Sequence, residues 1–125
     1  MALILVVDDE PSIVELVAKI LERMGHSVVS AANADEALAV LDRSRPELAL
    51  VDLVMPGKGG MTLIIENLRS RPGLRVIAMS GRIPLGTEGF AGFSAQFGID
   101  CMLNKPFTPQ ELEASVEKAL AKRCG

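Results

Sequence analysis

The sequence predicts a single α/β domain built on a doubly wound parallel sheet. Short, continuously apolar runs recur along the chain, segments with helical spacing separate them, and 125 residues are enough to bury one core. Continuous apolar runs are typical of parallel strands that are covered on both faces. When such strands alternate with helices and the crossovers are right-handed, the result is a doubly wound sheet.

Five segments are predicted to form the strands of this sheet. Residues 3–7, 48–51 and 75–79 are the clearest, because they are almost entirely apolar. Residues 26–31 and 101–104 are weaker, since polar side chains interrupt them. We therefore expect the three clear segments to be the more deeply buried strands.

Four amphipathic stripes predict helices between and after these strands. Their apolar positions are Ile13, Val14, Val17, Leu21 and Met24; Ala37, Leu38 and Leu41; Met61, Ile64 and Leu68; and Leu112, Val116 and Leu120. Gly25 is expected to end the first helix. Asn33 and Glu36 form a capping pattern before the second helix, and Thr108 and Glu111 form a capping box before the last.

A fifth helix is predicted over about residues 90–97, which brings the total to about five. The preceding stretch, 81–93, contains four glycines and Pro84 and favours a loop. No repeat, linker or low-complexity segment interrupts the chain, so residues 1–125 are predicted to form one domain, with no output domain in this chain.

Composition and charge exclude several classes of protein. The net charge of −3 gives no reason to expect direct nucleic-acid binding through a basic surface. No apolar stretch approaches the roughly 20 residues that span a bilayer, and the first residues do not form a signal peptide. A cytoplasmic protein without a membrane partner is expected. Cys101 and Cys124 are interpreted as reduced thiols.

Polar side chains follow four of the five predicted strands. Asp8 and Asp9 follow the first strand, and Asp52 follows the third. Ser80 and Lys105 follow the fourth and the fifth. Because ligands of such sheets bind at the carboxyl ends of the strands, we expect these side chains to lie together. Clustered carboxylates raise each other's pKa, and a hard divalent cation relieves the repulsion.

This set of groups suits phosphoryl transfer. A carboxylate can attack a phosphoryl group to give an aspartyl phosphate, and Mg²⁺ binds both carboxylates and phosphate oxygens. Lys105 is a point charge suited to a phosphoryl oxygen, and Ser80 can donate a hydrogen bond to another. Taken alone, Asp8 and Asp9 could cap a helix, Ser80 could begin a turn and Lys105 could be an ordinary surface lysine. Their combination favours the phosphoryl-transfer interpretation.

The chain resembles the response-regulator receiver domains of two-component signalling. The resemblance rests on four motifs in order, which are VVDDE (6–10), VDLVMPGKGG (51–60), AMSG (78–81) and LNKPF (103–107). It implies a flavodoxin-like fold, with five strands in the order 2-1-3-4-5.

The resemblance also implies a role for each matching position. Asp52 is the implied phosphoacceptor. Lys105 is implied to contact the phosphoryl group, and its peptide bond to Pro106 is implied to be cis. The implied ligands of Mg²⁺ or Mn²⁺ are Asp8, Asp9, Asp52 and the backbone carbonyl of Val54. The residues implied to switch or tune the response are Ser80, Gly81, Arg82, Met102 and Val54. Met102 stands where the family usually carries an aromatic residue. We therefore expect the glycine-rich loop over residues 81–92 to carry the conformational change, with the largest change between Ser80 and Phe97.

The leading hypothesis is a phosphorylation-controlled signalling switch. A histidine kinase or a histidine phosphotransfer protein would phosphorylate Asp52. A downstream protein, which the sequence does not identify, would read the altered face formed by the predicted strand 75–79, the helix predicted over about 90–97 and the predicted strand 101–104. The domain would catalyse only its own phosphorylation and dephosphorylation, so it is not predicted to be an enzyme. The alternative is a phosphate-independent interaction module of the same fold. An enzyme of flavodoxin-like fold is a distant third, since Asp8 and Asp9 would repel an anionic cofactor.

Overall fold

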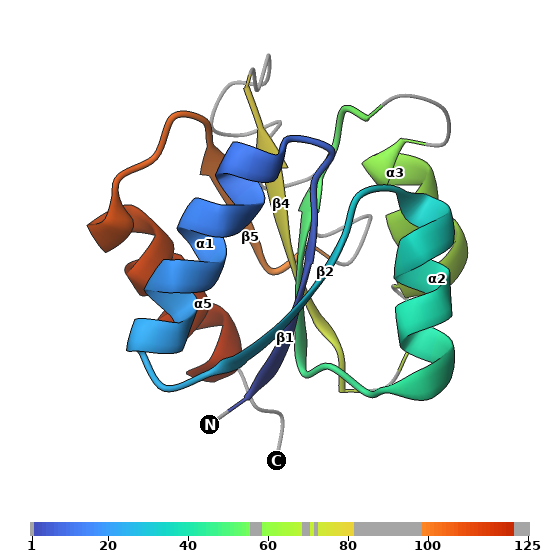
Figure 1. The fold of residues 1–125 in the computed structure, drawn as a ribbon, viewed down its shortest axis with the longest axis horizontal. Coiled ribbons are helices and arrows are strands. Elements are labelled where there is room, and N and C mark those ends of the chain that lie inside the picture. Colours follow the sequence, from blue (N-terminus) through green and yellow to red (C-terminus); the bar gives the residue numbers. More distant parts are fainter. Residues whose placement is uncertain (1, 56–58, 69–70, 72, 82–98, 122–125) are drawn as a thin grey trace.

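The computed structural model describes residues 2–55, 59–68, 71, 73–81 and 99–121. Within these residues, five parallel strands form one sheet in the order β2-β1-β3-β4-β5, which confirms the predicted fold class (Figure 1). The strands are β1 (Leu3–Val7), β2 (Ser27–Ala31), β3 (Leu48–Asp52), β4 (Arg75–Ser80) and β5 (Cys101–Asn104).

Helices cover both faces of this sheet. The described helices are α1 (Pro11–Arg23), α2 (Ala34–Arg43), α3 (Gly60–Leu63) and α5 (Pro109–Ala121). A π-helical turn, η1 (Ile64–Leu68), continues α3, where the sequence predicted one uninterrupted helix. α1 and α5 lie on one face, and α2 and α3 lie on the other (Figure 1). The helix predicted over about residues 90–97 lies outside the described residues.

The ends of three helices follow the predicted local chemistry. The hydroxyl of Thr108 accepts a hydrogen bond from the Glu111 N–H at 3.1 Å, and the Glu111 carboxylate accepts one from the Thr108 N–H at 2.8 Å, so the capping box before α5 is confirmed. The side chain of Asn33 accepts from the Glu36 N–H at the start of α2. Gly25, with φ 95°, follows the end of α1 in a conformation that favours glycine.

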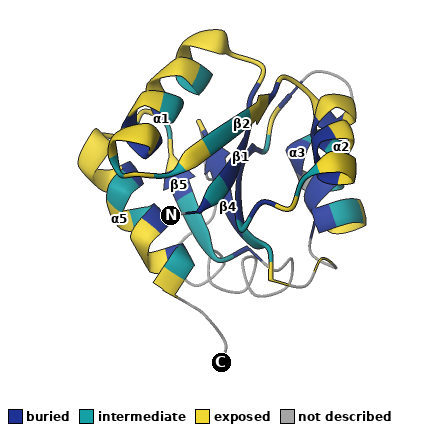
Figure 2. Ribbon diagram, turned by 60° about the horizontal axis from the view of Figure 1, so that its bottom comes forward, coloured by how far each residue is buried: buried dark blue, intermediate teal, exposed yellow. Residues whose placement is uncertain are grey.

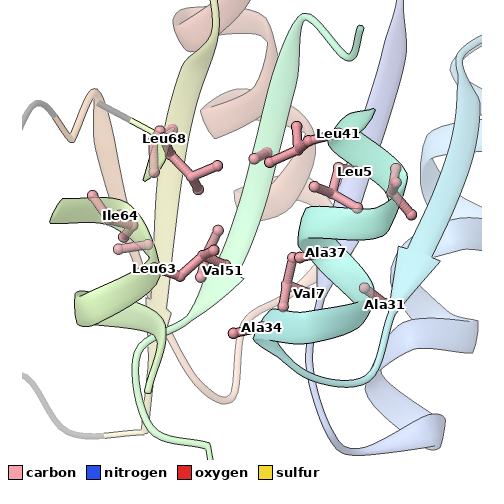
Figure 3. Packing of buried hydrophobic residues seen from close by; sticks show 14 of the residues in the cluster. Leu5, Val7, Ala31, Ala34, Ala37, Leu41, Val51, Leu63, Ile64 and Leu68 are labelled. Carbon is pink, nitrogen blue, oxygen red and sulfur yellow. The ribbon is translucent and has the colours of Figure 1, made fainter. Parts of the chain in front are cut away.

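The three central strands separate two apolar cores. Every residue of β3 is buried, whereas the outer strands β2 and β5 are partly exposed, as their weaker apolar character predicted (Figure 2). Successive side chains of a strand point to opposite faces. Leu5 and Val7 therefore pack against α2 and the α3–η1 segment (Figure 3), while Ile4 and Val6 pack against α1 and α5.

Two further predictions concern the membrane and the cysteines. None of the helices in the described ranges combines the length and the apolar character needed to cross a membrane. Cys101 is a free thiol, as expected, and Cys124 lies outside the described residues.

Candidate functional site

Side chains from three strand ends meet at the carboxyl edge of the sheet. Asp8 follows β1, Asp52 ends β3, and Lys105 follows β5. The Lys105 amine lies 2.7 Å from a carboxylate oxygen of Asp8 and 3.3 Å from one of Asp52. The Asp8 side chain is fully buried, the Asp52 side chain is 6% exposed and the Lys105 side chain is 13% exposed. The structure thus brings together three of the predicted site residues as one buried ion-pair cluster.

Backbone hydrogen bonds that continue the sheet hold these three residues in place. The Asp8 N–H donates to the Ala31 carbonyl at 3.1 Å, one step beyond β1. The Lys105 N–H donates to the Ser80 carbonyl at 2.8 Å, one step beyond β5. Asp52 itself lies within the ladder, paired with Met79 of β4. β1 and β3 are almost entirely buried and β5 is partly buried, so burial of the strands fixes where each side chain emerges.

In each buried carboxylate, one oxygen accepts a hydrogen bond from a backbone N–H and the other accepts one from the Lys105 amine. The Glu10 N–H donates to Oδ1 of Asp8 at 2.9 Å, and the Val54 N–H donates to Oδ1 of Asp52 at 3.1 Å. In both residues Oδ2 accepts from the Lys105 amine. Hydrogen bonds to the charged form and an adjacent cation are what allow a carboxylate to stay ionised away from water.

Burial nevertheless dominates the ionisation of Asp52. Loss of water raises the pKa of Asp52 above its usual 3.8, and the Asp8 charge adds to the rise, while the Val54 N–H and Lys105 oppose it. For Lys105, burial acts to lower the pKa, but the hydrogen bond and charge of Asp8, together with Asp52, outweigh it and raise the pKa. Lys105 is therefore a cation at neutral pH, and the Asp52 carboxylate is less well stabilised than an exposed one.

A third carboxylate completes an acidic cluster. Oxygens of Asp8, Glu10 and Asp52 all lie within 4.8 Å of one another, and Glu10 is also 3.5 Å from the Lys105 amine. Glu10 was not predicted as a site residue, although it belongs to the VVDDE motif and its place beside two other acids was the available signal. Asp9 is exposed and is not part of this cluster, so its metal-binding role remains a prediction.

Gly60 lets the chain pass close to the acidic edge. A Cβ at this position would lie 1.9 Å from the backbone carbonyl oxygen of Asp52, so any side chain would force the backbone to move. At Gly59 the corresponding distance, to the Leu53 carbonyl, is 3.4 Å. Gly60 belongs to the VDLVMPGKGG motif, but the sequence did not single it out as the position that requires glycine.

The structure describes four of the five predicted switch and tuning residues. Ser80 is buried at the end of β4, and Gly81 is exposed with open space around it. Val54, next but one to Asp52, is 74% exposed. Met102 is half-buried in β5 and packs against the core on the α2 side. Arg82 and the loop proposed to move lie outside the described residues.

The Lys105–Pro106 peptide bond is cis, as the resemblance implied.

Comparison with known proteins identifies relatives of this sequence and fold. The family described as "Response regulator receiver domain" matches residues 4–117. A CheY-like response regulator receiver domain protein from Methanospirillum hungatei has a solved structure with a TM-score of 0.85 and 32% identity, covering 98% of this chain and 95% of that one.

Curated relatives point the same way. Regulatory protein VanR of Enterococcus faecium is 34% identical over 119 residues, which are 95% of this chain and 50% of VanR. The alkaline phosphatase synthesis transcriptional regulatory protein PhoP of Bacillus subtilis is 35% identical over 120 residues, which are 96% of this chain and 48% of PhoP. The chain thus spans about half the length of these curated relatives.

Proposed function

The chain belongs to the response regulator receiver domain family, and on this premise we propose that it is a signalling switch phosphorylated on Asp52. The observation that carries the proposal is the place of Asp52 at the end of β3, with its carboxylate 3.3 Å from the Lys105 amine. A carboxylate held beside a lysine can act as a nucleophile toward a phosphoryl group whose oxygens the lysine then contacts.

The proposed phosphodonor is the phosphohistidine of a histidine kinase or of a histidine phosphotransfer protein. A carboxylate oxygen of Asp52 forms a bond to phosphorus as the bond between phosphorus and the histidine nitrogen breaks. The leaving nitrogen keeps the electron pair and takes up a proton. Lys105 and Ser80 are proposed to bind the phosphoryl oxygens once the group has moved.

A divalent cation is proposed to assist this transfer. Asp8, Glu10 and Asp52 supply carboxylate oxygens, which are the ligands that Mg²⁺ or Mn²⁺ prefers. Asp9 and the Val54 carbonyl are further proposed ligands. When bound, the cation would neutralise charge on the phosphoryl oxygens. Lys105 brings one positive charge to the two negative charges of Asp8 and Asp52 in the structure. Its amine would turn toward the phosphoryl group once a cation shared those carboxylates.

Receiver domains are regulatory phosphoacceptors, and signalling by this chain requires a partner that reads its state. We propose that hydrolysis of the aspartyl phosphate resets the domain without an external substrate. We also propose that phosphorylation alters the face that includes β4 and β5, because Ser80 and Lys105 lie at the ends of those strands. A downstream protein is the expected reader of that face.

Intact-mass measurement after incubation with acetyl phosphate and Mg²⁺ tests this function. The wild-type chain should gain one phosphoryl group, and Asp52→Asn should gain none. Asp42→Asn, which changes an exposed acid on α2, is the matched control and should be labelled like the wild type. Full labelling of Asp52→Asn would refute the assignment. A folded wild type that takes up no phosphoryl group would favour the phosphate-independent module.

A further inference from the structure

A second group of charged side chains lies at the opposite edge of the sheet. Residues 44–47, which lead into β3, and residues 73 and 74, which lead into β4, lie there, at the amino ends of both strands (Figure 1). Between them is a hollow of about 450 Å³, which we call the arginine hollow. Its lining includes Arg43, Arg45, Arg71, Asp42, Leu41 and Leu74.

Among the described residues, the three arginines of this hollow have no partner for their side chains. Among the residues that the structure describes, none of their guanidinium groups forms an ion pair or a hydrogen bond, although the chain carries 16 acidic and only 13 basic residues. Nearby Arg75 differs, because its guanidinium donates to the Gly73 carbonyl at 3.0 Å. Each unpaired guanidinium offers five N–H donors. The hollow therefore brings together N–H donors to which no described residue of the chain supplies an acceptor.

The remaining lining indicates what kind of ligand fits. Three arginines and one aspartate (Asp42) give a formal lining charge of +2, from three positive charges and one negative. A monovalent anion would gain less electrostatic attraction from this lining than a divalent or trivalent one. Leu41 is buried and Leu74 is half-buried, so part of the lining is apolar. The planar guanidinium matches phosphate oxygens in paired hydrogen bonds.

The dimensions and the net charge argue against nucleic acid as the ligand. A nucleic-acid surface presents a basic stripe on a basic domain, whereas this chain carries −3 overall and the hollow is compact. We propose that the arginine hollow binds a small ligand through a multiply charged phosphate group, with Arg45 and Arg71 holding the group from its two sides. The site is separate from Asp52, so the proposal does not depend on phosphorylation of the chain.

Titration of the uniformly ¹⁵N-labelled chain with pyrophosphate, followed by amide chemical shifts, tests this site. The titration is run at pH 7 without divalent cations and at fixed ionic strength, because exposed charges are screened by salt. Saturable shifts are expected in residues 42–45, 47 and 73–75. Shifts confined to the Asp52 and Lys105 edge, or shifts that grow linearly without saturation, would overturn the proposal.

Matched variants separate a built site from general attraction to positive charge. Arg45→Gln and Arg71→Gln should each weaken pyrophosphate binding about tenfold, since each removes a charged pair of donors. Arg23→Gln, which changes an exposed arginine at the end of α1, should change the affinity less than twofold. All three variants should keep the wild-type amide spectrum away from the mutated residue. Equal weakening by Arg23→Gln, or tighter binding of a polyglutamate peptide than of pyrophosphate, would contradict a phosphate site.

Discussion

Charged side chains lie at both edges of the sheet, but the two edges differ in how far these side chains are buried and paired. At the carboxyl edge, Asp8 and Asp52 are buried and share the Lys105 amine. At the amino edge, the arginines of the hollow are exposed, and within the described part of the chain their side chains have no partner. A buried charge is costly unless it is paired, whereas an exposed one is solvated by water. Pairing is therefore obligatory at the first edge and unnecessary at the second.

The backbone is also packed more closely at the carboxyl edge than at the amino edge. Gly60 is required at the carboxyl edge because a Cβ would collide with the Asp52 carbonyl. Gly73, before β4 at the amino edge, has open space around it and is favoured only by its φ of 78°. Close packing at one edge and local conformation at the other make the same residue type necessary for different reasons.

The largest effect is expected from removing the shared cation. Lys105→Met leaves Asp8 and Asp52 buried without a counter-ion, so the free energy of unfolding at pH 7 should fall by about 3 kcal/mol. Urea unfolding measures this loss. The loss should shrink near pH 3, because the Asp52 carboxyl, whose pKa is raised by burial, is protonated there and no longer needs the lysine.

Lys118→Met provides the control for this measurement. Lys118 is exposed in the last turn of α5, so its removal should change stability by less than about 0.5 kcal/mol. Equal effects of the two substitutions would mean that the carboxyl edge is as well solvated as the surface, and the comparison between the edges would fail.

Alanine at three glycines tests the packing difference. Gly60→Ala should lower stability by about 2 to 3 kcal/mol, because backbone must move to admit the methyl group. Gly73→Ala should cost about 1 kcal/mol, since only the positive φ opposes it. Gly59→Ala, whose Cβ would lie 3.4 Å from the nearest carbonyl, should cost least. Thermal unfolding ranks the three, and a Gly73 variant less stable than the Gly60 variant would reverse the interpretation.

Neutralising Asp52 should stabilise the fold at neutral pH. Burial raises the pKa of Asp52 in the folded protein. The stability that this raised pKa contributes is therefore fully present below the ordinary pKa of 3.8, and it is lost as the pH rises through the raised pKa of the folded protein. Asp52→Asn avoids that loss, so it should be more stable than wild type at pH 7 by about 1 kcal/mol.

The gain in stability from Asp52→Asn should disappear below pH 3.8, where the wild-type carboxyl is neutral like the asparagine amide. Denaturant unfolding at pH 7 and pH 3 compares the two conditions. A variant less stable than wild type at pH 7 would show that the pairing of Asp52 with Lys105 outweighs its burial.

The smallest effect is expected at the amino edge. Arg71→Gln should leave the free energy of unfolding within about 0.5 kcal/mol of wild type, because the side chain is exposed and makes no ion pair with described residues. Urea unfolding in chloride buffer provides the measurement. A clear destabilisation would reveal a structural role for this arginine and weaken the contrast with Lys105.

Much of the site could be predicted because its residues directly follow apolar runs. Asp8, Asp52 and Lys105 emerge where buried strands end, so the location of each strand also located its functional side chain. The capping box of Thr108 and Glu111 could be predicted for a similar reason, since both partners lie within four residues of each other.

Contacts between distant segments could not be predicted in this way. Asp9 and Glu10 are adjacent acids, yet only Glu10 lies beside Lys105, because the direction of each side chain depends on how the chain turns from β1 into α1. The collision that requires glycine at Gly60 involves a carbonyl eight residues earlier, and no local pattern signals it. The switch predicted within residues 81–97 remains a prediction.

The sequence by itself determined the order of strands and helices, the caps and the identity of the central ion-pair residues, because these follow from local periodicity and from burial of apolar runs. Only the tertiary structure decided which acids share Lys105, which glycine admits no side chain, and that Arg45 and Arg71, 26 residues apart, line one hollow. The physical reason is that distances between side chains on different elements depend on packing, whereas the formation of each element depends mainly on its own residues.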